Sequence, residues 1–125
     1  MKILDHVPAF HRKIYSLLKK VPKGKVTTYK ALAQAAGTKA YRAVGQAMRC
    51  NPYAPIVPCH RVVASDGSIG GFRGTRNSKS KEIGEKIKML RREGVEIRSS
   101  KVIDFKRKLH DFQTKRSQYG AMRST

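Results

Sequence analysis

Acidic residues are scarce in this sequence: its 125 residues include 8 Asp and Glu against 28 Lys and Arg, for a formal net charge of +20 at pH 7. So large an excess of positive charge attracts polyanions, and nucleic acid is the polyanion we expect. The alternative is a highly soluble protein whose basic side chains only face water.

Cysteine and long apolar runs are also scarce. Cys50 and Cys59 do not make a disulfide framework, and with the scattered histidines they give no zinc-ligand spacing. No apolar run approaches the roughly 18 residues of a membrane span, and Asp5, His6 and Pro8 interrupt any signal-peptide pattern. We therefore expect a protein of the reducing cell interior that neither enters a membrane nor holds a metal ion.

The apolar residues recur at helical spacing and predict a small, mainly α-helical domain. Helices are expected over residues 10–21, from a cap at Thr27 or Thr28 to Gly37, over residues 40–49, over residues 79–93 and from Asp104 onward. Two short helices joined by a tight turn that contains glycine form a helix-turn-helix pattern, whose second helix normally enters a groove of DNA. We expect this pattern in the second and third helices.

A short β-hairpin wing is expected beside the helix pair. Residues 56–64 have the composition of a strand, Asp66-Gly67 is typical of a hairpin turn, and a glycine-rich loop follows. A phosphate-binding loop is the other interpretation of these glycines, but the order and the Lys-Ser/Thr pair of a P-loop are missing. The pattern favours a winged-helix-like domain over residues 1–98 and a basic extension over residues 99–125, partly helical or disordered.

The segment Val57-Pro58-Cys59-His60-Arg61-Val62 has the most chemical content. A thiolate is a strong nucleophile, and a neighbouring base or positive charge favours the ionised form of a cysteine. Neighbouring side chains on a strand point to opposite faces, so a buried Cys59 followed by a surface His60 is the ordinary interpretation. The residues around this segment decide between the two.

One known family carries the same ordered set of residues. The sequence resembles the DNA-binding catalytic domain of the O6-alkylguanine-DNA alkyltransferases in Tyr29, Arg42-Ala43-Val44-Gly45, Asn51-Pro52, Pro58-Cys59-His60-Arg61-Val62 and Gly70-Gly71-Phe72. The resemblance runs from about residue 10 to residue 94. It implies transfer of an alkyl group from O6 of guanine in duplex DNA to the protein's own cysteine, irreversibly and without a cofactor.

The resemblance also implies a role for each matching residue. Cys59 would accept the alkyl group, His60 would deprotonate it through a bridging water, and Glu93 would hold His60 in the required tautomer. Asn51 would form hydrogen bonds around this network and shape the turn. Tyr29 would offer its hydroxyl to the extruded base.

The helix that carries Arg42 is implied to bind DNA in the minor groove. Arg42 would enter the base stack when the damaged base is turned out, a step that costs a few kcal/mol of stacking and pairing. The small residues Ala40, Ala43 and Gly45 would allow the helix to approach closely. The charge of the chain agrees with binding through phosphates and groove shape.

Four features depart from the pattern of that family. In Asn51-Pro52-Tyr53-Ala54-Pro55 the second proline stands one place later than in many members, which would change the width of the pocket. Tyr41 stands where a small residue is usual, so the helix face near the arginine is more crowded. Phe72 replaces a frequent tyrosine in the loop over the pocket, and Arg73 follows where a small residue is common. Both loop residues are still expected to lie at the substrate.

The main hypothesis is therefore a single-use DNA repair protein that acts as a monomer, without an obligate protein partner, on duplex DNA containing O6-alkylguanine. The second is a non-catalytic alkyltransferase-like protein that binds alkylated guanine and flags it for other repair factors. Such proteins usually carry Trp or Ala in place of the cysteine. The third, a helix-turn-helix transcription factor, would not need Cys59, Asn51 and Glu93 together.

Overall fold

The computed structural model describes residues 7–72, 75, 77 and 79–112. The mainly helical class expected from the sequence is confirmed, with a few very short strands. In chain order the elements are α1 (Ala9–Leu18), β1 (Thr27–Thr28), α2 (Tyr29–Ala35), α3 (Tyr41–Arg49), a 3₁₀ turn (Cys59–Arg61), β2 (Val62–Val63), α4 (Lys81–Arg92), β3 (Ile97–Arg98), β4 (Lys101–Val102) and α5 (Phe105–Lys108).

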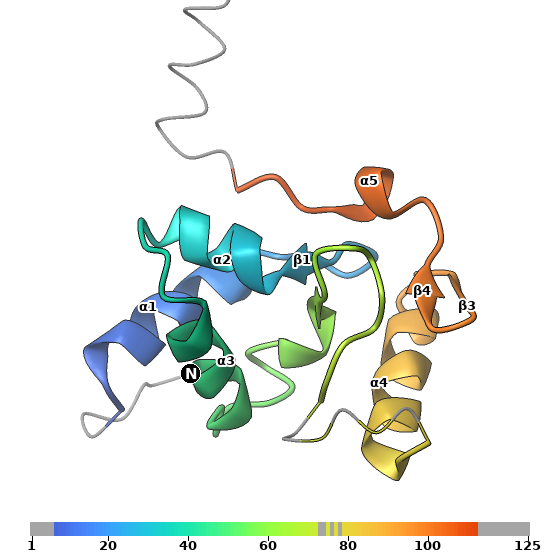
Figure 1. Ribbon diagram of the computed structural model, residues 1–125, viewed down its shortest axis with the longest axis horizontal. Helices are drawn as coiled ribbons and strands as arrows, with labels where there is room; N and C mark the ends of the chain where they lie inside the picture. The colour runs from blue at the N-terminus through green and yellow to red at the C-terminus, as the bar shows by residue number, and fades with distance from the viewer. Residues whose placement is uncertain (1–6, 73–74, 76, 78, 113–125) are drawn as a thin grey trace, which may run out of the picture.

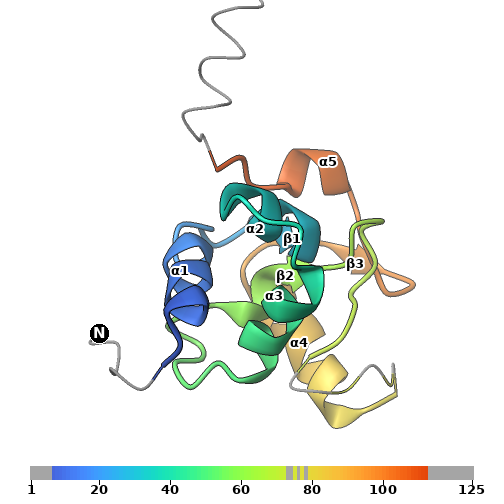
Figure 2. The ribbon, with the colours of Figure 1, turned by 60° about the vertical axis from the view of Figure 1, so that its left-hand side comes forward.

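Two helical parts lie on either side of a small parallel sheet. Helices α1, α2 and α3 pack together on one side, α4 stands on the other, and β1 and β2 lie between them (Figures 1 and 2). Thr27 is opposite Val62 and Thr28 is opposite Val63 in the sheet. The pairing brings the start of α2 next to the chain that leaves the 3₁₀ turn.

Local sequence explains how the first three helices begin and end. The Thr28 hydroxyl accepts a hydrogen bond of 2.9 Å from the Ala31 amide, which caps α2 as expected. Gly37 takes a left-handed φ of +77° just beyond α2. Tyr15 of α1 is fully buried, and its hydroxyl donates to the Ala47 carbonyl of α3 at 2.8 Å. The three helices thus form one core around side chains that the helical spacing had pointed inward.

The strand expected over residues 56–64 is wrong except at Val62–Val63. Residues 59–61 form a 3₁₀ turn instead, in which the Arg61 amide donates to the Pro58 carbonyl at 2.9 Å. A turn does form at Asp66-Gly67, but β2 pairs with β1 rather than with the residues after that turn. The described residues form a β-hairpin later, where β3 pairs with β4.

The chain after residue 98 packs against the helical core. The Val26 amide donates to the Lys108 carbonyl at 2.9 Å, and the His110 amide donates to the Val26 carbonyl at 2.8 Å. The expected boundary between residues 98 and 99 falls in the turn of the β3–β4 hairpin. The expected disorder of the last dozen residues lies outside the described residues.

The helix expected from Asp104 onward is short, and Asp104 directly precedes it. Asp104 has a left-handed φ of +56° and makes no side-chain capping hydrogen bond. Helix α5 ends at Lys108, so Leu109 and Phe112 lie beyond it. No described helix is long and apolar enough to cross a membrane.

Candidate active site

One 3₁₀ turn contains Cys59, His60 and Arg61, so their side chains point in three directions. That helix has about three residues per turn, so successive side chains point about 120° apart. Cys59 faces a pocket, whereas His60 and Arg61 both reach the end of α4. The ordinary interpretation of the sequence, a surface His60 opposite a buried Cys59, therefore fails, since His60 is 2% exposed.

Glu93 receives three hydrogen bonds from this turn. Nε2 of His60 lies 2.9 Å from Oε2 of Glu93. Arg61 donates from Nε to Oε1 at 2.9 Å and from a terminal nitrogen to Oε2 at 2.7 Å. Its other terminal nitrogen donates to the Val21 carbonyl at 2.7 Å, three residues beyond the end of α1. Arg61 thus fixes the carboxylate that holds His60.

The end of α4 places Glu93 through a glycine. Gly94 has φ +91°, its amide donates to the Arg91 carbonyl at 3.0 Å, and the Val95 amide donates to the Leu90 carbonyl at 3.0 Å. These two bonds are the Schellman motif, with buried Val95 and Leu90 in the usual apolar pair. Glu93 is the last residue before the reversal, and its carboxylate lies over the 3₁₀ turn.

The protonation states follow from burial and from these bonds. Burial lowers the pKa of His60, and the hydrogen bond with Glu93 offsets only part of this effect. Burial acts to raise the pKa of Glu93, but the hydrogen bonds from Arg61 and His60 outweigh it and the net shift is downward. A neutral His60 beside an ionised Glu93 donates from Nε2, so Nδ1 carries the free lone pair. Nδ1 is buried and has no hydrogen-bond partner among the described residues.

Asn51 holds the turn that leads to Cys59. Its Nδ2 donates to the Val57 carbonyl at 2.9 Å, and its Oδ1 accepts from the Tyr53 amide at 2.9 Å. These two bonds hold the segment between α3 and Pro58 in a turn. The structure therefore supports the part of the expectation in which Asn51 shapes the turn.

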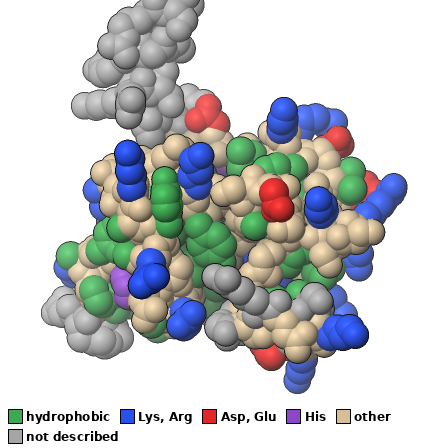
Figure 3. Space-filling view, in the orientation of Figure 1, with side chains coloured by type: hydrophobic (Ala, Val, Ile, Leu, Met, Phe, Trp, Pro, Cys, Tyr) green, Lys and Arg blue, Asp and Glu red, His purple; other side chains and the backbone are tan. Residues whose placement is uncertain are grey.

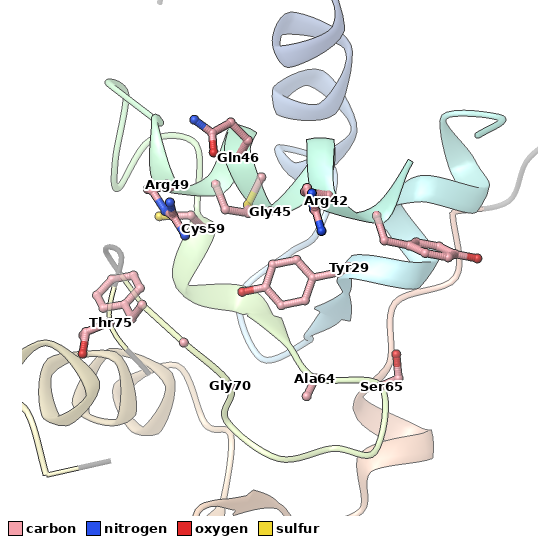
Figure 4. Close-up of a pocket in the computed structure, with 14 residues that line it drawn as sticks. Tyr29, Arg42, Gly45, Gln46, Arg49, Cys59, Ala64, Ser65, Gly70 and Thr75 are labelled. Atoms are coloured by element: carbon pink, nitrogen blue, oxygen red, sulfur yellow. The ribbon is translucent and has the colours of Figure 1, made fainter. Parts of the chain in front are cut away.

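A pocket of about 810 Å³ opens in front of Cys59, between α3 and the glycine-rich loop (Figure 4). Tyr29, at the start of α2, projects its hydroxyl end into the space between α3 and the loop that carries Gly70. The residues that line the pocket are Tyr29, Tyr41, Arg42, Gly45, Gln46, Met48, Arg49, Cys59, Ala64, Ser65, Gly70, Gly71, Phe72 and Thr75. None of these described residues is acidic.

The pocket collects five of the eleven site residues expected from the sequence. Tyr29, Arg42, Gly45, Cys59 and Phe72 line it, whereas His60 and Glu93 lie behind Cys59 and Asn51 supports the turn. Ala40 is the exposed residue before α3, and Ala43 is half-buried on that helix, outside the pocket lining. Arg73 lies outside the described residues.

Lys86 is the site residue that sequence reasoning missed. It is fully buried, and its Nζ donates to the carbonyls of Val62, Ile69 and Gly71 at 2.6, 2.6 and 2.8 Å. One ammonium therefore joins α4 to β2 and to the loop that forms a pocket wall. Burial lowers the pKa of Lys86 to about 7. Its spacing from Ile83 and Leu90 on the inward face of α4 was the available signal.

A family model for the DNA-binding domain of 6-O-methylguanine DNA methyltransferase matches residues 9–95. The chain belongs to this family. The match takes in all of the site, from α1 to the glycine that ends α4.

Individual relatives show the extent of the similarity. The methylated-DNA–protein-cysteine methyltransferase of Thermococcus kodakarensis is 48% identical over 92 residues, which cover 73% of this chain and 48% of the relative. A bifunctional methyltransferase/endonuclease of Picrophilus torridus is 45% identical over 95 residues, 75% of this chain and 29% of the relative. The chain thus spans about half or less of the length of these curated relatives.

A solved structure resembles more of the chain. The structure of Atl1 from Schizosaccharomyces pombe, in complex with damaged DNA containing O6-carboxymethylguanine, has a TM-score of 0.67 and 30% sequence identity. It covers 88% of this chain, which in turn covers 99% of Atl1.

Proposed function

We propose that this protein repairs O6-alkylguanine in duplex DNA by transferring the alkyl group to Cys59. The observation that carries the proposal is the connected series of Cys59 at the pocket, buried His60 behind it and Glu93 bonded to His60. A nucleophile next to a base that a third group orients is the arrangement expected of nucleophilic catalysis. Family membership and the relatives named as cysteine methyltransferases support it.

The chemical step uses each of these groups once. Sγ of Cys59 forms a bond to the alkyl carbon, and the bond between that carbon and O6 breaks with its electron pair going to guanine. The thiol proton passes through a water to Nδ1 of His60. The Tyr29 hydroxyl donates a hydrogen bond to the departing base. The base takes up one proton from solvent to become ordinary guanine, and His60 releases the thiol proton to solvent. The thioether on Cys59 is stable, so each protein acts once.

The lesion has to leave the duplex to reach Cys59, because Cys59 is a buried residue at the pocket. We infer that α2 and α3 act as the helix-turn-helix and that Arg42, exposed at the start of α3, takes the place of the extruded base. Lys and Arg side chains are spread over both halves of the face shown in Figure 3. These side chains would bind the phosphates of DNA. The protein would act as a monomer inside the cell.

A second candidate function is binding without transfer. The similarity to Atl1 continues past the family match and into the chain that follows residue 95. An Atl1-like protein would mark alkylated guanine for other factors. The presence of Cys59 in the pocket favours transfer, because binding alone does not need a nucleophile next to a base.

Counting transferred methyl groups tests the proposal. Excess duplex DNA containing O6-methylguanine with a labelled methyl group is incubated with a known amount of protein. We expect a plateau of one methyl per protein molecule, and none with Cys59→Ala, which still binds the DNA. A plateau at zero for the unmodified protein overturns transfer, and tight lesion-specific binding in that case supports the second candidate.

Arg42→Ala tests the proposed extrusion separately. Transfer from duplex DNA should slow by about tenfold or more, because the cost of extruding a base is a few kcal/mol. Transfer from free O6-methylguanine should be unchanged. Arg92→Ala, at an exposed position of α4, is the matched control. Equal slowing on both substrates contradicts this role for Arg42.

A further inference from the structure

Tyr41 is an exposed aromatic residue at the mouth of the pocket. It is the first residue of α3, it lines the same pocket as Cys59, and it is 44% exposed. Among the described residues, the large hydrophobic side chains left this exposed are Tyr41 and Ile56, and only Tyr41 lines the pocket. A ring in this position at the rim of a site is free to stack against a flat, partly apolar partner.

The surroundings of Tyr41 leave room for such a partner. Gly45 lies one helical turn further along the same face of α3, and a Cβ added to it would meet no atom within 4 Å. The face of α3 beyond the ring is therefore open. Within the described part of the chain, no hydrogen bond or ring contact holds the Tyr41 side chain.

The charged residues near Tyr41 indicate which kind of partner this surface would bind. Lys39 and Arg42, on either side of Tyr41 in the chain, are both exposed, and the described pocket residues include no carboxylate. The partner should offer a flat apolar face next to negative charge. A nucleobase attached to its phosphates has this combination, and bases stack on exposed aromatic side chains in many proteins.

We propose that Tyr41 stacks on a base that flanks the extruded nucleotide in the bound duplex, an inference that rests on the proposed function. When one base leaves, each neighbour loses one stacking face, and an aromatic ring restores it. Successive helical side chains point about 100° apart, so Tyr41 and Arg42 contact different groups. Arg42 enters the vacated position, and Tyr41 covers the part of a flanking base that Arg42 leaves open. The resembled family usually has a small residue here, and members with that small residue are not expected to make this contact.

Three substitutions separate stacking from mere apolar contact. Tyr41→Ala, Tyr41→Leu and Tyr41→Phe are made in the Cys59→Ala background, and the dissociation constant for duplex DNA containing O6-methylguanine is measured. We expect Tyr41→Ala to weaken binding about tenfold, Tyr41→Phe to restore it and Tyr41→Leu to restore it only in part. Ile56→Ala, which removes the other exposed hydrophobic side chain, should bind normally. Unchanged binding by Tyr41→Ala, or full restoration by Leu, overturns stacking.

Two further readouts keep this inference distinct from the proposed function. With 2-aminopurine beside the lesion, binding of the Tyr41 protein should lower its fluorescence more than binding of Tyr41→Ala; equal fluorescence contradicts the stack. In the Cys59 protein, Tyr41→Ala should slow transfer from duplex DNA but not from free O6-methylguanine, and equal slowing overturns the inference. If the parent transfers to neither substrate, the proposed function fails, while the binding series still decides on Tyr41.

Discussion

His60 and Glu93 are joined by a hydrogen bond of 2.9 Å, although one lies in the 3₁₀ turn and the other at the end of α4. The bond uses Nε2 and leaves Nδ1 as the nitrogen that accepts a proton. Arg61 holds the same carboxylate through both of its oxygens. The base of the proposed reaction is thus oriented by two elements that meet only in the folded chain.

Glu93→Gln should slow methyl transfer by about 100-fold, within the range associated with a positioned acid–base group. An amide does not hold the His60 tautomer as a carboxylate does, and it pairs less well with Arg61. Glu96→Gln makes the same chemical change at an exposed position and should react at the normal rate. Rates are measured in single turnover with duplex DNA. A normal transfer rate for Glu93→Gln would show that Glu93 does not position His60 for the reaction.

Transfer should depend on pH through His60. Because burial lowers the pKa of this residue below 6.5, its ring stays neutral at pH 7 and loses its capacity as a base only at lower pH. The free energy of unfolding should fall in the same direction, since the unfolded chain takes up this proton at higher pH than the folded chain. Transfer rates and urea unfolding between pH 5 and 8, with His60→Gln as reference, check both effects. A wild-type rate that rises on acidification would contradict them.

Asn51→Ala should destabilise the fold by about 1–3 kcal/mol, because the Val57 carbonyl and the Tyr53 amide each lose a partner. Transfer should slow as well, since these bonds shape the turn that positions Cys59. Asn77→Ala removes an exposed amide whose oxygen accepts a hydrogen bond of 3.0 Å from the Lys79 amide, and it should have a much smaller effect because water replaces that bond. Urea midpoints and transfer rates measure the difference. If Asn51→Ala has the same urea midpoint as the control, the turn before Cys59 does not depend on the hydrogen bonds of Asn51.

Lys86→Met should lower the free energy of unfolding at pH 7. The expected loss is about 1–3 kcal/mol for each buried carbonyl that no longer receives a hydrogen bond. The pKa of Lys86 is about 7 in the folded chain against an ordinary 10.5, so the unfolded chain binds more protons between these values. The free energy of unfolding of the wild type should therefore rise with pH across this window relative to Lys86→Met. Lys88→Met, exposed on the same helix, is the control. A difference that stays constant with pH would contradict the lowered pKa.

Local signals in the sequence were sufficient for parts of the fold. The Thr28 cap and the turn at Gly37 depend on a few neighbouring residues, and both form as predicted. The apolar composition of residues 56–64 predicts a strand, but Pro58 stands directly before the 3₁₀ turn that forms instead. A proline removes a backbone donor and favours turns, which is the physical reason for the difference.

The site required long-range contacts that periodicity does not reveal. Cys59 and Tyr29 were found through resemblance, but the sharing of Glu93 by His60 and Arg61 depends on how α4 packs against the 3₁₀ turn. Lys86 has the spacing of an inward-facing residue, yet a lysine is normally read as exposed. Its burial is compensated by three carbonyls from two other segments.

The two cysteines provide the most direct test of the account. Cys50 is exposed and Cys59 is buried at the pocket, so non-specific alkylation favours Cys50 whereas the proposed reaction uses Cys59. The protein is incubated with duplex DNA containing O6-methylguanine, digested and analysed by peptide mass spectrometry. We predict one added methyl on the peptide with Cys59 and none on the peptide with Cys50. A methyl on Cys50, or on neither peptide, would contradict the central claim.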